Sequence, residues 1–262
     1  MLFKVLVLVY RFIFARPFFC KFNKILFHLS LRGLGVLNYE SDAVSGEVKF
    51  LKSRLSKLHN GYVLDVGANI GKYAKHVKRA NPMVRIFCFE PHPQNFKILC
   101  ENTRGIVSAA HNVAVGSSAG SMKLYDYRVN DGSSHASLYQ DVIEKIHAQP
   151  SVSHDVAVIT IDDFIVENDI NRISLLKIDT EGHELAVLKG ASKSISAGKI
   201  EAIHFEFNEM NVVSRIFMRD FFELLPNYKF YRLLPNGLLP FANYDPVFCE
   251  IFAFQNIVAI RN

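Results

Sequence analysis

Short apolar runs alternate with helical patterns along most of the chain from residue 62 onward. Apolar and β-branched residues predict strands at residues 62–66, 84–90, 106–115, 156–161, 175–178, 202–207, 228–234 and 247–254. Helical patterns follow several of these runs. They extend from the glycine turn after residue 66 to about residue 79, from residue 91 to about residue 102, and over residues 184–195 and 212–225. Because such alternation builds parallel βαβ units, we expect an α/β fold with a doubly wound, mostly parallel sheet.

Between about residues 116 and 153 this alternation is interrupted. Gly, Ser, Asp and Asn dominate the segment, and one hairpin is predicted around residues 121–127. We interpret the segment as an insertion that lies over the strand ends as a lid. Residues 132–137 are a candidate lining for an acceptor site, with a flexible loop as the alternative interpretation.

The first 37 residues combine apolar side chains with regularly spaced basic ones. Their longest uncharged apolar run, residues 5–10, is far below the roughly 18–20 residues that span a bilayer. Arg11 and Arg16 fall where a signal peptide would be apolar. Two interpretations stay open, a helix on the surface of an anionic membrane or extra helices packed on the domain. We expect an N-terminal extension over residues 1–46 and one domain over 47–262.

The charge distribution narrows the choice of partners. Six of the 30 basic residues lie in residues 1–39, which hold no acidic residue, so residues 40–262 carry 24 basic and 25 acidic side chains. The domain therefore has no basic excess for a nucleic acid. Four widely spaced cysteines without a Cys-x-x-Cys motif argue against a zinc or disulfide framework and favour a reducing, cytoplasmic location.

The first candidate ligand site follows the strand at residues 62–66. Gly67 allows a tight turn and Gly71 allows close backbone approach, so a nucleotide-like ligand can rest at the helix N-terminus. Asp65 favours a cationic amine and would repel the pyrophosphate of NAD. Glu90, at the end of the next strand, can accept hydrogen bonds from ribose hydroxyls. A nicotinamide-dependent oxidoreductase would need Gly-x-Gly-x-x-Gly, which residues 67–71 do not supply.

Acidic residues also close two later strands. Asp179, Glu181 and His183 follow the strand at 175–178, and we favour a functional role for the two acids; capping of the next helix is the alternative. Glu206 ends the strand at 202–207 and is expected close to Asp179, and we include it among the candidate catalytic residues, with structural hydrogen bonding as its alternative. The spacing of these acids alone does not establish a metal site, and none is predicted.

These motifs, taken in order, resemble the FkbM family of S-adenosylmethionine-dependent methyltransferases. The resemblance covers about residues 46–254 and is carried by residues 63–71, 89–96, 112–116, 161–164 and 175–191. It implies a class I, Rossmann-like methyltransferase fold with a seven-stranded sheet whose last strand is antiparallel. It also implies S-adenosyl-L-methionine as cofactor, held by Asp65, Gly67, Asn69, Gly71 and Glu90, with Asn112 and Ala114 near the adenine.

The resemblance implies methyl transfer to a hydroxyl oxygen, for which Asp179, Glu181 and His183 are the candidate bases. A positioned base typically contributes about 10²–10⁴-fold to such a reaction. We expect the acceptor to be a sugar hydroxyl of a cell-surface polysaccharide or glycolipid, reached from the inner face of the membrane. A secondary-metabolite hydroxyl is the alternative acceptor, and a catalytically silent, membrane-attached binding module is the alternative function.

Overall fold

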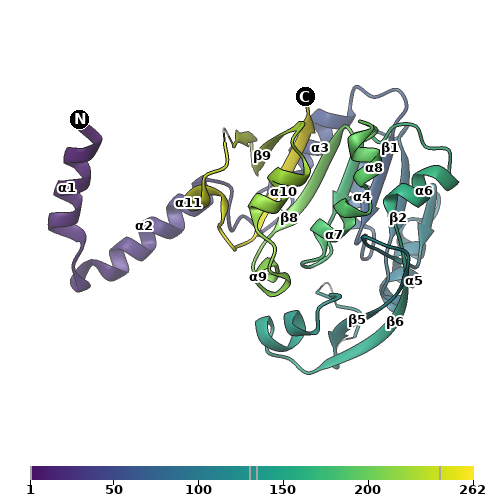
Figure 1. Ribbon diagram of the computed structural model, residues 1–262, viewed down its shortest axis with the longest axis horizontal. Helices are drawn as coiled ribbons and strands as arrows, with labels where there is room; N and C mark the ends of the chain where they lie inside the picture. Colours follow the sequence, from purple (N-terminus) through teal and green to yellow (C-terminus); the bar gives the residue numbers. More distant parts are fainter. Residues whose placement is uncertain (1, 130, 134, 242) are drawn as a thin grey trace.

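A central sheet organises the computed structural model, which describes residues 2–129, 131–133, 135–241 and 243–262. Within these residues the sheet has eight strands in the order β10-β9-β11-β8-β7-β1-β2-β3 (Figure 1). Their bounds are β1 (Tyr62–Val66), β2 (Arg85–Phe89), β3 (Ala109–His111), β7 (Leu175–Ile178), β8 (Ala202–Phe207), β9 (Tyr228–Leu234), β10 (Gly237–Pro240) and β11 (Gln255–Arg261).

The strand directions confirm the predicted doubly wound, mostly parallel sheet. β3, β2, β1, β7 and β8 pair in parallel, whereas β11 runs antiparallel to both β8 and β9. These strands with β9 make the seven-stranded arrangement of a class I methyltransferase fold, with the last strand antiparallel. The described sheet has an eighth strand because β10 adds an antiparallel partner at the edge of β9.

Helices cover both faces of this sheet. On one face lie α3 (Glu47–Leu55), α4 (Lys72–Ala80) and α5 (Pro93–Asn102), and their apolar sides pack on alternate residues of the strands. The other face carries α6 (Ile161–Glu167), α7 (Glu184–Lys189), α8 (Ser192–Ser196) and α10 (Met218–Leu224). The helices therefore pack on the two faces of the sheet. The ends of β1, β2, β7 and β8 are left available for a site.

Two long helices expected from the sequence are broken. The predicted helix at 184–195 divides into α7 and α8 at Gly190, where an added Cβ would lie 2.0 Å from the carbonyl oxygen of Gly116. The predicted helix at 212–225 divides into α9 (Met210–Ser214) and α10, because Arg215 between them takes a left-handed conformation with φ of 57°.

Three strand predictions were wrong. The run at 106–115 leaves the central sheet after β3, and β4 (Ala114–Val115) joins a second sheet of order β4-β6-β5. The expected hairpin at 121–127 is one long strand, β5 (Gly120–Tyr127), which pairs along its length with β6 (Ser151–Ile159). The run at 247–254 begins as α11 (Pro246–Cys249), since Asp245 caps that helix through Val247.

The N-terminal arm, residues 2–33, projects away from this domain (Figure 1). It consists of α1 (Leu2–Phe14), the short 3-10 helix η1 (Pro17–Phe19) and α2 (Cys20–Gly33). No residue of α1 is buried, and α2 buries only Leu31. Packing of these helices on the domain, one of the two interpretations of the sequence, is therefore not observed. None of the helices in the described part of the chain is long and apolar enough to cross a bilayer.

Candidate active site at the strand ends

A cavity of about 420 Å³ opens at the carboxyl ends of the parallel strands β1, β2, β7 and β8. This volume lies within the roughly 300–1,000 Å³ of small-molecule sites, and the position is where α/β sheets bind ligands. Eight of the residues singled out from the sequence line it: Asp65, Gly67, Asn69, Glu90, Ala114, Asp179, Glu181 and Glu206.

The glycine turn after β1 fixes the first wall of the cavity. The backbone amides of Gly67 and Ala68 both donate to the carbonyl oxygen of Phe89, each at 3.0 Å, which ties the turn to β2. Gly67 has φ of 77°, and a Cβ there would lie 1.7 Å from the carbonyl oxygen of Asp179. Only glycine lets the ends of β1 and β7 approach this closely.

Glu90 is held between two backbone turns. Its carboxylate accepts hydrogen bonds from the amide of Asn69 at 2.7 Å and from the amide of His92 at 2.8 Å. Each carboxylate oxygen keeps a second lone pair, so the side chain can still accept bonds from ligand hydroxyls in the cavity. Burial raises the pKa of Glu90 to about 7, although both amide bonds oppose that rise.

Asp65 and Lys177 lie at one level of neighbouring strands. They are register partners on β1 and β7, and both are buried and line the cavity. Burial raises the pKa of Asp65 to about 7, and the positive charge of Lys177 counteracts that effect. The Nζ of Lys177 lies 3.5 Å from Oδ2 of Asp179.

The turn after β7 separates a structural acid from one that faces the cavity. Glu184 accepts hydrogen bonds from the backbone amides of Thr180 and Gly182, at 3.0 and 3.1 Å, so this acid stabilises the turn. Glu181 instead lines the cavity and has a left-handed φ of 51°. Burial raises the pKa of Glu181 to about 7, against the contact with His135. Its Oε2 has no hydrogen-bond partner among the described residues.

Three residues singled out from the sequence lie behind the cavity lining. His183 is buried beside Tyr139, 3.2 Å from its hydroxyl, and burial lowers the pKa of His183 to about 4. Asn112 donates to the backbone carbonyls of Glu90 and Pro91 at 2.8 and 2.9 Å. Gly71 packs against the side chain of Thr103. The structure therefore gives these residues contacts that shape the lining.

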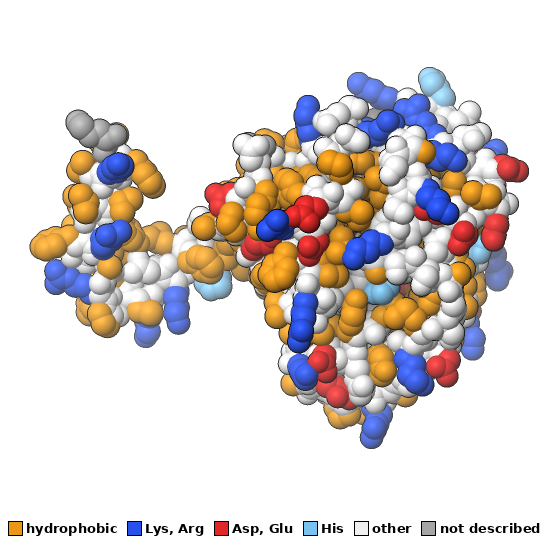
Figure 2. All heavy atoms as spheres, viewed as in Figure 1, with side chains coloured by type: hydrophobic (Ala, Val, Ile, Leu, Met, Phe, Trp, Pro, Cys, Tyr) orange, Lys and Arg blue, Asp and Glu red, His pale blue; other side chains and the backbone are white. Residues whose placement is uncertain are grey.

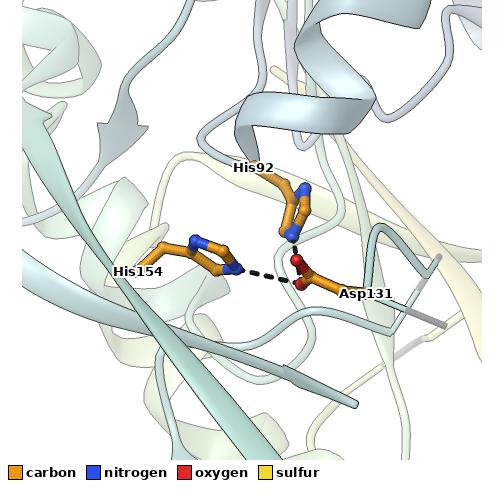
Figure 3. Close-up of side chains that lie close together, drawn as sticks. All are labelled: His92, Asp131 and His154. Atoms are coloured by element: carbon orange, nitrogen blue, oxygen red, sulfur yellow. Dashed lines mark hydrogen bonds and ion pairs between the residues drawn. The ribbon is translucent and has the colours of Figure 1, made fainter. Parts of the chain in front are cut away.

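Figure 3 shows a cluster of His92, Asp131 and His154 that joins the insertion to the turn after Glu90. Oδ1 of Asp131 lies 2.8 Å from Nε2 of His92 and 2.9 Å from Nε2 of His154. The amide of Gln94 donates to Nδ1 of His92, so the proton of a neutral His92 ring is on Nε2. A metal-binding histidine has the opposite arrangement, because its second nitrogen donates outward. We therefore interpret the cluster as a hydrogen-bonded clamp.

The clamp holds part of the insertion over the cavity. Asp126 accepts hydrogen bonds from the amides of Gly132 and Ser133, both at 2.8 Å, and this fixes the loop beside the clamp. Ser133 and Ala136 from the proposed acceptor segment line the cavity, together with Leu138. Ser134 of that segment lies outside the described residues.

A sequence model of the family described as "Methyltransferase FkbM domain" matches residues 65–230, which include the glycine turn and all four acidic strand ends. The chain belongs to the FkbM family of S-adenosylmethionine-dependent methyltransferases. The resemblance that the motifs predicted is thereby confirmed. S-adenosylmethionine, the expected cofactor, is confirmed with it as the cofactor of the family.

Three relatives of this FkbM domain are methyltransferases by name. Methyltransferase sdnD of Sordaria araneosa is 30% identical over 51% of this chain and 61% of its own length. Methyltransferase 1 of Beauveria bassiana is 29% identical over 58% of this chain and 70% of its own length. Hexuronic acid methyltransferase AglP of Haloferax volcanii is 26% identical over 58% of this chain and 59% of its own length. The chain thus spans about three fifths of the length of two of these relatives.

The lining of the FkbM domain includes residues that sequence reasoning missed. Lys177 had a signal, since it is a lone charge within the apolar strand β7. Tyr39, Asp42 and Glu47 come from the segment before and at the start of α3, which has no strand-end motif. Tyr73 on α4 also faces the cavity.

Proposed function

We propose that this chain transfers a methyl group from S-adenosyl-L-methionine to a hydroxyl oxygen. The observation that carries the proposal is the pair of buried carboxylates, Asp65 and Glu90, at neighbouring strand ends of one cavity. Buried carboxylates are costly unless a cation or hydrogen-bond donor compensates them. The ammonium and the ribose hydroxyls of an adenosyl amino acid supply both kinds of partner.

The remaining residues of the proposed cofactor site have supporting roles. Gly67, Asn69 and Ala114 line the cavity, and their small side chains or exposed backbone leave room for the adenosyl group. Gly71 and Asn112 hold the first helix turn and the loop after Glu90 in place. Asn112 therefore acts through the backbone that presents Glu90.

For the reaction itself, we assign the general base to Glu181. Asp65 and Glu90 would hold S-adenosylmethionine, which when bound would supply an activated methyl carbon to the hydroxyl oxygen and would leave as the thioether. Glu181 accepts the hydroxyl proton, and its pKa of about 7 suits a base near neutral pH. Asp179 and Glu206 line the same cavity and orient the acceptor. His183, buried outside the lining, positions the turn that carries Glu181.

A sugar hydroxyl of a cell-surface polysaccharide or glycolipid is the acceptor we propose. The relative from Haloferax volcanii, whose name specifies a hexuronic acid, supports a carbohydrate. Incubating the purified chain with labelled methyl donor and either glycan extract or a metabolite extract tests this choice. Label in the glycan fraction supports it; label only among metabolites contradicts the acceptor; no label in either contradicts the enzyme activity.

We further propose that the N-terminal arm contacts an anionic membrane surface. Its exposed apolar residues include Leu2, Phe3 and Phe12, and basic side chains lie among them with no acidic residue in residues 2–39 (Figure 2). An anionic lipid surface complements both properties, and each Lys or Arg near it contributes about 1 kcal/mol. The arm joins the domain where Leu37 donates to Phe254, which itself lines the cavity. A lipid-linked acceptor would therefore lie close to the site.

We also propose a two-part organisation of the chain. We propose that residues 1–46 form an extension and residues 47–262 the methyltransferase domain. The last part of the extension serves both, since Tyr39, Ser41, Asp42 and Ser45 line the cavity.

A further inference from the structure

Lys177 is a buried cation with no hydrogen-bonded acceptor among the described residues. The residue is 3% exposed and lines the cavity, and its Nζ is itself buried. Because side chains alternate along a strand, Lys177 shares a sheet face with Asp65 on β1 and His204 on β8. The nearest carboxylate oxygen, Oδ2 of Asp179, lies 3.5 Å away, and the ring of Tyr73 lies 5.7 Å from Nζ.

This arrangement is unusual for a purely structural ion pair. An ammonium has three donors, and a buried charge normally satisfies them with close, well-aligned acceptors. The acids that act on Lys177 electrostatically come from several elements, namely Glu47 on α3, Asp65 on β1, Asp179 after β7 and Glu206 on β8. None of them forms a hydrogen bond with Nζ in the described chain. The donors of Lys177 are therefore available to a ligand in the cavity.

The other cationic side chains of the cavity already have partners. Lys72 and His76, both on α4, each contact Asp42 at 2.8 Å. His204 on β8 is buried outside the lining. It hydrogen-bonds with the Tyr73 hydroxyl at 3.0 Å and with Asn256 at 2.8 Å, and burial keeps its pKa well below the usual value. Among the described residues that line the cavity, Lys177 is thus the cation left for an anionic ligand group.

We propose that Lys177 binds the α-carboxylate of the amino-acid part of the cofactor, while Asp65 binds its α-ammonium. The two side chains are register partners on adjacent strands, so opposite charges lie side by side at the level of the glycine turn. An amino-acid zwitterion presents the complementary pair of charges on one carbon atom. This inference rests on the proposed function, because it assigns a part of the same cofactor.

Ligand truncation tests the assignment without measuring turnover. Calorimetry compares S-adenosylhomocysteine with its decarboxylated analogue, which keeps the amine and the adenosine. In the wild-type chain we expect S-adenosylhomocysteine to bind about 10–100-fold more tightly, the effect of a hydrogen bond between charged groups. Lys177→Met should remove this difference by weakening S-adenosylhomocysteine alone, and Lys177→Arg should restore part of it.

The controls separate three outcomes. Lys97→Met, on the exposed side of α5, should bind both ligands as the wild type does. Equal affinity of the wild type for both ligands overturns the role of Lys177 while leaving the proposed function intact, even if Lys177→Met does not fold. Equal weakening of both ligands in a folded Lys177→Met also overturns it, since a structural role would have that effect. Failure of the wild type to bind either ligand contradicts the proposed function itself.

Discussion

The cavity and the N-terminal arm depart from the usual distribution of side chains in opposite directions. In the cavity, charged groups such as Asp65 and Lys177 are buried, whereas in α1 large apolar groups are exposed. Both arrangements are unfavourable without a partner, because buried charge needs compensation and exposed apolar area favours association. We therefore expect two ligands of contrasting chemistry, a small charged one in the cavity and an extended apolar and anionic surface at the arm.

The largest expected effect concerns the base in the cavity. Glu181→Gln should lower the methyl-transfer rate about 10²–10⁴-fold, because the amide cannot accept the hydroxyl proton. Affinity for S-adenosylhomocysteine should change little. The wild-type rate should also fall as the pH drops below about 7, where Glu181 becomes protonated. Glu167→Gln, on the exposed end of α6, is the matched control. A wild-type rate in Glu181→Gln would remove this residue from the reaction.

The second prediction concerns the ligand amine that we expect to compensate the buried charge of Asp65. Asp65→Asn should weaken S-adenosylhomocysteine about 10–100-fold in calorimetry, since it loses a charged hydrogen bond to the ligand amine. Wild-type affinity should rise as the pH increases through about 7, where Asp65 ionises. The variant should show a shallower rise. An unchanged affinity and pH profile in Asp65→Asn would place the ligand amine elsewhere.

The same carboxylates should make the ligand-free chain less stable at higher pH. The pKa values of Asp65 and Glu90 are about 7 in the folded chain, above the roughly 4 of unfolded carboxyl groups, so the folded state holds more protons between these values. Their contribution to the free energy of unfolding is therefore greatest below about pH 4 and is lost as the pH rises to about 7. Thermal unfolding should show this loss, and Asp65→Asn should reduce it. A slope that the variant leaves unchanged would contradict the assignment to Asp65.

Binding of the arm to an anionic membrane should depend on the exposed apolar residues of the arm. Leu6→Glu on α1 should reduce binding to vesicles with anionic lipid about tenfold or more, because it removes apolar contact and adds a repelled charge. Val247→Glu introduces the same charge at a position that is 87% exposed on the domain, and it should bind as the wild type does. Cosedimentation measures both variants. Wild-type chain that self-associates through the arm and ignores the vesicles would favour a second copy as the partner.

The smallest effect is expected at the clamp of the insertion. Asp131→Asn weakens the contacts with His92 and His154 and should lower the free energy of unfolding by about 1 kcal/mol. Asp155→Asn on the exposed side of β6 should change it by less than about 0.5 kcal/mol. Denaturant unfolding compares the two variants. Equal effects would show that the clamp adds no stability.

Sequence patterns were most informative where local rules decide the structure. Asp65, Glu90, Asp179 and Glu206 were placed at strand ends because each closes an apolar run, and parallel strands bring such ends together. The path of residues 112–115 was missed, since β4 joins the second sheet by pairing with β6, which lies far along the chain.

The part of the site that was missed also depends on non-local contacts. Tyr39, Asp42 and Glu47 reach the cavity through tertiary packing of a segment with no motif of its own. The last strand was misplaced because the apolar run at 247–254 follows Asp245 and Pro246, which start a helix there. β11 begins only at Gln255, after that run has ended.

We propose that two buried carboxylates bind opposite ends of one adenosyl ligand, and a crystal structure of the complex with S-adenosylhomocysteine would show whether they do. We expect ribose hydroxyls on the Glu90 carboxylate and the ligand amine on Asp65, above the turn at Gly67. A well-ordered ligand bound away from this turn, or bound there with neither carboxylate in contact, would contradict it.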